Sequence, residues 1–224
     1  MKNLITALCI LAIFVVSCSK KKELAEEISK QEILNNKIKD IIPVQYLDSL
    51  KKLGMEVNSN FTPPNIEGTY AIAPMVLKNT SVPNDNKIGT RYLDGKVQFN
   101  SQKSDFSINL LGQHLVRNRD TSIVTAIAGS GNDFTIYGKV RSTIGTNSAI
   151  FAIIISGVKD GAAIKNYKMG IINIDDSNGG GNFVIQGRAR VAEDQDGISE
   201  SIDPNTFSSN LRDSGIGMTV GKLK

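Results

Sequence analysis

The stretch DFTIYGKVRS, Asp133–Ser142, alternates apolar and polar side chains along its whole length. One face carries Phe134, Ile136, Gly138 and Val140, and the other carries Thr135, Tyr137, Lys139 and Arg141. A period of two predicts a β-strand with one buried face and one face in water. This pattern is typical of antiparallel sheets, and the rest of the fold follows from its repetition.

The same alternation recurs over residues 182–192. We expect Phe183, Ile185, Gly187, Ala189 and Val191 inside and Val184, Gln186, Arg188 and Arg190 in water. Residues 149–155, by contrast, are apolar on both faces, so a second element must cover the outside of that strand. A predicted helix between Pro43 and Gly54, with Tyr46, Leu47, Leu50 and Leu53 on one face, is the candidate cover.

Short β-prone runs continue from Ile66 onward, separated by clusters of Gly, Asn, Asp and Ser. We predict eight strands, at 68–73, 90–100, 105–111, 121–129, 133–142, 149–158, 164–174 and 182–192. Tight-turn sequences at 129–132 and 159–161 join neighbours as antiparallel hairpins. Closing such a meander removes its two unpaired edges. The prediction is a mainly β fold, an eight-stranded up-and-down barrel with an N-terminal helical segment packed outside, and the alternative is a β-sandwich.

The N-terminus carries an export pattern. Lys2 precedes an apolar run from Leu4 to Val16, which is too short to span a bilayer permanently, and Ser17-Cys18 follows. These residues resemble the bacterial lipobox. The resemblance implies that the Cys18 thiol is acylated, that cleavage makes Cys18 the first mature residue, and that the lipid anchors the protein to a membrane. We therefore expect a signal peptide at 1–17, a lipidated helical tether and linker at 18–64, and the barrel at 65–224.

Three further resemblances concern the barrel, the arrangement of the chain and its location. Gly68-Thr69-Tyr70, after a helical segment and before a meander, resembles the first-strand Gly-x-Trp of the lipocalin (calycin) plan, with Tyr in place of Trp. The complete arrangement resembles small uncharacterised lipoproteins of Gram-negative bacteria. Ser19 after the cysteine resembles the outer-membrane sorting pattern, which implies a lipid-anchored location in the outer membrane.

The composition argues against catalysis and nucleic-acid binding. The chain has 224 residues, a formal charge of +4 with scattered basic residues, and one histidine, His114, so a multi-histidine metal site is excluded. No Gly-x-Ser-x-Gly elbow occurs. The acidic run at 193–197 places Ala192 where a calcium loop needs its first ligand. We expect a protein that is not an enzyme and has no cofactor, metal or nucleic-acid partner.

Two functional hypotheses remain. In the first, aromatic side chains line a cavity inside the barrel that encloses a small apolar or amphipathic ligand. The candidate lining residues are Tyr70, Phe99, Phe106, Phe134, Phe151 and Phe183. In the second, the same aromatics fill a solid core, and the outer face of a structural or interaction lipoprotein contacts another envelope protein. The small residues Gly138, Gly187 and Ala189, expected to point inward, favour the cavity.

Overall fold

The computed structural model describes residues 2–116, 120–206 and 218, with the backbone alone for residues 2–20 and Asp120. Helix α1 (Lys2–Ile41) is followed by helix α2 (Val44–Lys52), and one 3-10 turn, η1 (Pro204–Thr206), lies near the C-terminus. Pro43 separates the two α-helices, since it has no N–H to continue α1. Gly54 follows α2 with φ of +93°, the left-handed conformation that glycine adopts without strain.

The described residues form one ten-stranded antiparallel sheet with the order β1-β3-β4-β5-β6-β7-β8-β9-β2, and β10 pairs with β8. Its strands are β1 (Gly68–Ile72), β2 (Met75–Thr80), β3 (Gly95–Asn100), β4 (Asn109–Gln113), β5 (Asp120–Ser130), β6 (Asp133–Ile144), β7 (Asn147–Asp160), β8 (Ala163–Asn178), β9 (Ala189–Asp194) and β10 (Ile198–Ser199). Each of the eight predicted strands has its counterpart, and β2 and β10 are additional.

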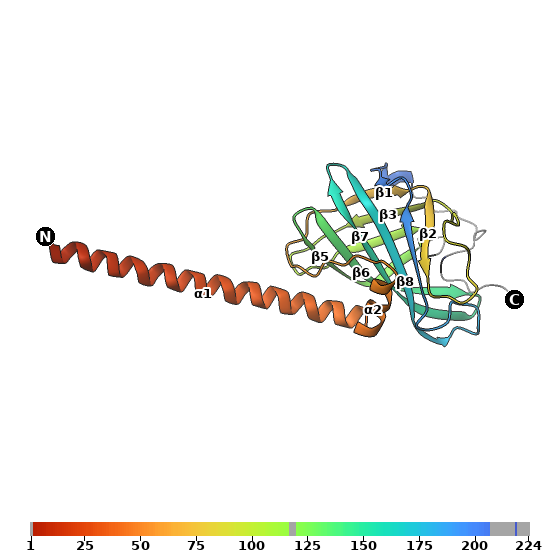
Figure 1. The fold of residues 1–224 in the computed structure, drawn as a ribbon, viewed down its shortest axis with the longest axis horizontal. Helices are drawn as coiled ribbons and strands as arrows, with labels where there is room; N and C mark the ends of the chain where they lie inside the picture. Colours follow the sequence, from red (N-terminus) through yellow and green to blue (C-terminus); the bar gives the residue numbers. More distant parts are fainter. Residues whose placement is uncertain (1, 117–119, 207–217, 219–224) are drawn as a thin grey trace.

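The sheet curls into a nearly closed barrel (Figure 1). β10 and the residues after it connect β1 with the start of β8. β10 pairs with the start of β8, the Ala71 N–H donates to the Glu200 carbonyl at 3.0 Å, and the Ile202 N–H donates to the Thr69 carbonyl at 2.8 Å. The predicted mainly β antiparallel barrel is thus confirmed, and the short β10 contributes to its near closure.

Two clusters of buried apolar side chains lie on opposite sides of the sheet. The inner cluster fills the barrel and contains Phe134, Ile136, Val140, Ile153 and Ile155, among others. The outer cluster lies between the sheet and the helices and contains Leu34, Ile38, Ile41, Leu50, Tyr137, Ala152 and Ile154. β7 therefore has both faces buried, as its apolar sequence predicts.

The cover over β7 is shared between the helices. α2 contacts β8 and β9, and the end of α1 contacts β5 and β6. Ala152 and Ile154 belong to the same cluster as Leu34 of α1 and Leu50 of α2. The helix predicted as the cover accordingly provides one part of it. The other part comes from the last turns of α1, because its apolar residues Leu34, Ile38 and Ile41 recur at helical spacing.

The outer face of β6 is only partly in water. Thr135 and Tyr137 are buried beneath the linker between α2 and β1. The Tyr137 hydroxyl donates to the Asn58 carbonyl at 2.7 Å, and the Asn58 N–H donates to Thr135 Oγ1 at 2.8 Å. Burial raises the pKa of Tyr137. The alternation predicted for this strand is correct, but a non-local segment covers the Thr135–Tyr137 part of its polar face, whereas Arg141 is exposed as predicted.

The rest of α1 extends away from the barrel as a single rod (Figure 1). Its apolar side continues beyond the packed turns through Leu24 and Ile28, whose side chains are exposed. Within the part of the chain that the structure describes, no helix has an apolar stretch long enough to cross a membrane.

Candidate functional site

The barrel interior brings five of the six predicted lining residues together. Tyr70, Phe99, Phe134, Phe151 and Phe183 are each at most 3% exposed and belong to the inner cluster. Their rings contact one another, with centroid distances of 6.2 Å for Tyr70–Phe99, 6.5 Å for Phe99–Phe134 and 6.2 Å for Phe151–Phe183. These distances are those of packed aromatic pairs.

Phe106 does not line the interior, and this part of the prediction is wrong. It belongs to the outer cluster, with Ala126 and Ala128 of β5. The strand predicted from residue 105 begins only at Asn109, so Phe106 lies in the preceding turn, with φ of +66°. Strand alternation does not apply there, and the side chain packs outside the barrel.

The faces of β9 are the reverse of the predicted ones. Ala189 and Val191 belong to the outer cluster, whereas Ala192 belongs to the inner cluster. Since successive side chains of a strand alternate, Arg190 is on the inner face with Ala192. Val184, expected outside, is buried in the inner cluster, and Ile185, expected inside, is exposed. Residues 182–188 precede the strand, so a register read through them assigns every later side chain to the wrong face.

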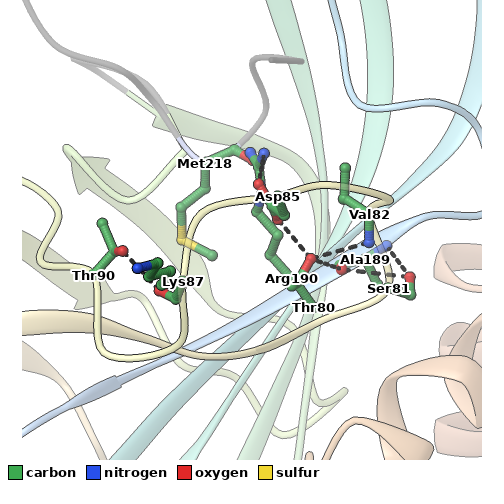
Figure 2. A network of polar contacts seen from close by, with 9 residues as sticks. All are labelled: Thr80, Ser81, Val82, Asp85, Lys87, Thr90, Ala189, Arg190 and Met218. Carbon is green, nitrogen blue, oxygen red and sulfur yellow. Dashed lines mark hydrogen bonds and ion pairs between the residues drawn. The ribbon is translucent and has the colours of Figure 1, made fainter.

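Arg190 forms a buried ion pair with Asp85 (Figure 2). Both side chains are 3% exposed. The guanidinium makes two hydrogen bonds to the carboxylate, from Nε to Oδ2 at 2.8 Å and from Nη2 to Oδ1 at 2.6 Å, and Nη1 donates to the Met218 carbonyl. This two-pronged geometry is the strongest that arginine makes with a carboxylate.

Asp85 comes from the connection between β2 and β3, residues 81–94, which we call the β2–β3 loop. Thr80, the last residue of β2, donates its hydroxyl to Asp85 Oδ2 at 2.6 Å and accepts the Val82 N–H at 3.0 Å. Burial disfavours the charged carboxylate, but the hydrogen bonds from Arg190 and Thr80 outweigh it, so the pKa of Asp85 is lowered. Asp85 is therefore an anion at neutral pH.

The surroundings of the pair are largely apolar. Leu77, Tyr92 and Met218 belong to the inner cluster, and the partly buried Val82 packs against it. Burial raises the pKa of the Tyr92 hydroxyl, and the charge of Asp85 adds to this rise, whereas the charge of Arg190 opposes it. Two opposite charges thus lie at the boundary between an apolar interior and a surface loop. Sequence reasoning missed both, because Asp85 lies in a turn-forming run, Pro83–Asn86, and Arg190 was assigned to water.

A second buried acid lies on the same face of β9. Asp194 is four residues beyond Arg190, about 13 Å along the strand, and accepts the Ser199 hydroxyl. It is part of the acidic run considered for calcium. Among the described residues, no three His, Cys, Asp or Glu side chains are grouped so that they could hold a metal ion.

Surface pockets occur on the outside of the barrel. One, of about 470 Å³, lies between the linker residues 56–60 and the ends of β6, β7 and β8. Asn58, Asn60, Thr135 and Ser156 contribute to its lining. Such a polar groove does not suit an apolar ligand. Cys18 lies within α1, but its side chain is outside the described residues, so the lipidation site stays a prediction.

No protein family, curated protein or solved structure that was compared with the chain matches it. The lipobox and lipocalin resemblances therefore also stay predictions, and the geometry of the site carries the functional argument.

Proposed function

We propose that this protein is a lipid-anchored protein of the bacterial outer membrane that binds a small amphipathic ligand inside its barrel. Cys18 provides the anchor, and α1 joins it to the barrel. The apolar residues of the inner cluster contact the apolar part of the ligand, and the Arg190–Asp85 pair lies next to its polar end.

The buried ion pair is the observation that carries this proposal. Desolvating two charges costs several kcal/mol per ion, and replacing such a pair by apolar residues of similar size is often neutral or stabilising. A barrel that needed only a solid core would gain little from Arg190 and Asp85 on its inner side. A site for a molecule with one polar and one apolar end combines an apolar lining with a few placed polar groups, as these residues and the inner cluster do.

A second candidate function is that of an interaction lipoprotein with a solid core. The aromatic contacts in the inner cluster favour it, because rings that pack against one another leave less room between them. The exposed Leu24 and Ile28 on the extended part of α1 offer an apolar surface for another envelope protein.

Mass spectrometry of small molecules released by denaturing the purified full-length chain tests the proposal. We expect one amphipathic compound in about equimolar amount to the protein. The substitution Ala192→Phe on the inner face should reduce this amount while the fold survives, and Ala189→Phe, the same change on the outer face, should not. If only bulk membrane lipid is released, in the same amount from all three proteins, the interaction lipoprotein is the better description.

A further inference from the structure

We infer that Arg190 is the binding residue for a carboxylate headgroup and that Asp85 occupies this position when no ligand is bound. This inference rests on the proposed function and specifies its ligand class: a small amphiphile with a carboxylate at one end and an alkyl chain at the other. The side chain of Asp85 thus stands in for the headgroup that the site recognises.

The geometry of the pair supports a carboxylate. Asp85 presents two oxygens to Nε and Nη2 of Arg190, at 2.8 and 2.6 Å, and accepts a third hydrogen bond from Thr80 at 2.6 Å. A planar guanidinium fork matches the two oxygens of a carboxylate. A ligand carboxylate in the same position would find the same three donors, because Arg190 and Thr80 both belong to strands and Asp85 alone comes from the loop.

The loop can release Asp85 without breaking the sheet. Pro83, Asn84, Lys87 and Ile88 are exposed, whereas Asp85 and Asn86 are the partly buried residues of this segment, and Asn86 lies beside Tyr92. The next fixed points are Gly89, whose N–H donates to the Leu77 carbonyl at 2.8 Å, and the neighbouring contacts of the loop with β2. An outward shift of the segment 83–88 would therefore leave the sheet intact and open a path to Arg190.

The apolar end of the ligand has a defined direction. Leu77 of β2 and Ala192 of β9 are fully buried in the inner cluster, on the side of the sheet where Arg190 lies. Ala192 is two residues from Arg190 on the same face of β9, and its small side chain leaves more room than its neighbours do. An alkyl chain attached to a carboxylate at Arg190 would extend past this position into the barrel.

Octanoate and octanol are a matched pair of probes, because both have an eight-carbon chain and they differ in the headgroup, a carboxylate in octanoate and a hydroxyl in octanol. The protein is the full chain in phospholipid nanodiscs, with empty nanodiscs as the reference for partitioning. Equilibrium dialysis measures saturable binding, and hydrogen exchange of peptides spanning 81–94 reports release of the loop. We expect octanoate to bind at least tenfold more tightly than octanol and to accelerate exchange in the β2–β3 loop, as one charged hydrogen-bonded contact predicts.

Three variants make the test specific. Asp85→Asn removes the internal anion and should raise the affinity for octanoate about tenfold or more. Asp85→Leu combined with Arg190→Met removes both charges without leaving one unpaired, and should abolish the preference for octanoate over octanol. Asp94→Asn is the control. It frees Arg91 from an arginine–carboxylate pair in the same loop, in which Nη2 donates to both oxygens of Asp94. Those side chains are 62% and 45% exposed, so affinity should not change.

The outcomes separate a failure of the carboxylate site from a failure of the proposed function. Equal binding of octanoate and octanol in the wild type and in Asp85→Asn overturns the carboxylate site and leaves the proposed ligand-binding function standing. Saturable binding of neither probe overturns both. A loss of stability in Asp85→Asn without any gain in octanoate affinity shows that the pair only fastens the loop, and overturns the inference.

Discussion

The Ser199 hydroxyl donates a hydrogen bond of 2.7 Å to Oδ2 of Asp194, and both side chains are buried. Ser199 belongs to β10, the short strand that contributes to the near closure of the barrel, and Asp194 ends β9. Burial, with the neighbouring charge of Asp196 adding to it, raises the pKa of Asp194 to about 6, although the bond from Ser199 acts in the opposite direction. The junction of the two strands therefore contains an acid that titrates near neutrality.

This raised pKa predicts a pH-dependent stability. The ordinary pKa is 3.8, so between about pH 4 and 6 the folded state holds a proton that the unfolded state has released. The free energy of unfolding contributed by Asp194 therefore falls as the pH rises through this window and stays low above it. We expect Asp194→Asn to remove this fall and to stabilise the protein at pH 7 by on the order of 1–3 kcal/mol.

Urea unfolding of the full chain at intervals from pH 4 to 8 measures the effect as the difference between variant and wild type. Glu200→Gln is the control, because Glu200 is an exposed acid after β10 that does not contribute to the shift of Asp194. Parallel pH profiles for Asp194→Asn and the wild type would show that Asp194 ionises normally.

Gly129 is the point where the linker joins the barrel. Its N–H donates to the Asn60 carbonyl at 2.7 Å, and its carbonyl accepts the Thr62 N–H at 3.0 Å. A Cβ at this position would lie 2.4 Å from the Asp133 carbonyl oxygen and 2.8 Å from Cα of Pro63. Because both are backbone atoms, Gly129→Ala should destabilise the protein by about 1–3 kcal/mol.

Gly170→Ala is the matched control for this change. Its Cβ would meet Leu50 and Met55 side-chain atoms at 2.8 Å, and side chains can shift where backbone cannot. Thermal melting should show the larger loss for Gly129→Ala. An equal or smaller loss would mean that the linker does not depend on this close approach.

β7 provides a test of the two clusters. Ile153 points into the inner cluster and Ile154 into the outer cluster, and both are fully buried. Ile153→Asp and Ile154→Asp should each cost several kcal/mol of stability, because neither acid would find a partner. Ile123→Asp, at an exposed position of β5, should change the melting temperature little. If Ile154→Asp had the same melting temperature as the wild type, this result would contradict the helical cover over β7.

The lipid anchor is tested at Cys18. Its replacement in Cys18→Ala removes the thiol that acylation requires, so we expect the N-terminal acyl groups and the cleavage before residue 18 to be lost. Mass spectrometry of the N-terminal peptide, taken from membrane fractions of cells that express the wild type or the variant, measures the acylation and the cleavage. The same acylated peptide from the variant would exclude Cys18 as the anchor.

The sequence by itself determined the approximate place of eight of the ten described strands and favoured an antiparallel barrel. In β6 the alternation of Phe134, Ile136 and Val140 with polar residues leaves only one face to bury, and this local period of two survives in the structure. β2 and β10 escaped prediction, since Met75–Thr80 has only three apolar residues in succession and Ile198–Ser199 is two residues long. Such short strands depend on pairing with distant partners.

Only the tertiary structure decided which side of β9 faces the interior. Ala189, Val191 and Ala192 are small or apolar on both faces, so the local pattern is compatible with either register, and an arginine between them is expected in water. Arg190 can be buried because Asp85, 105 residues earlier in the chain, is held against it by the β2–β3 loop. A charge is buried only when its partner is in place, and the position of a partner so distant in sequence is a property of the folded chain.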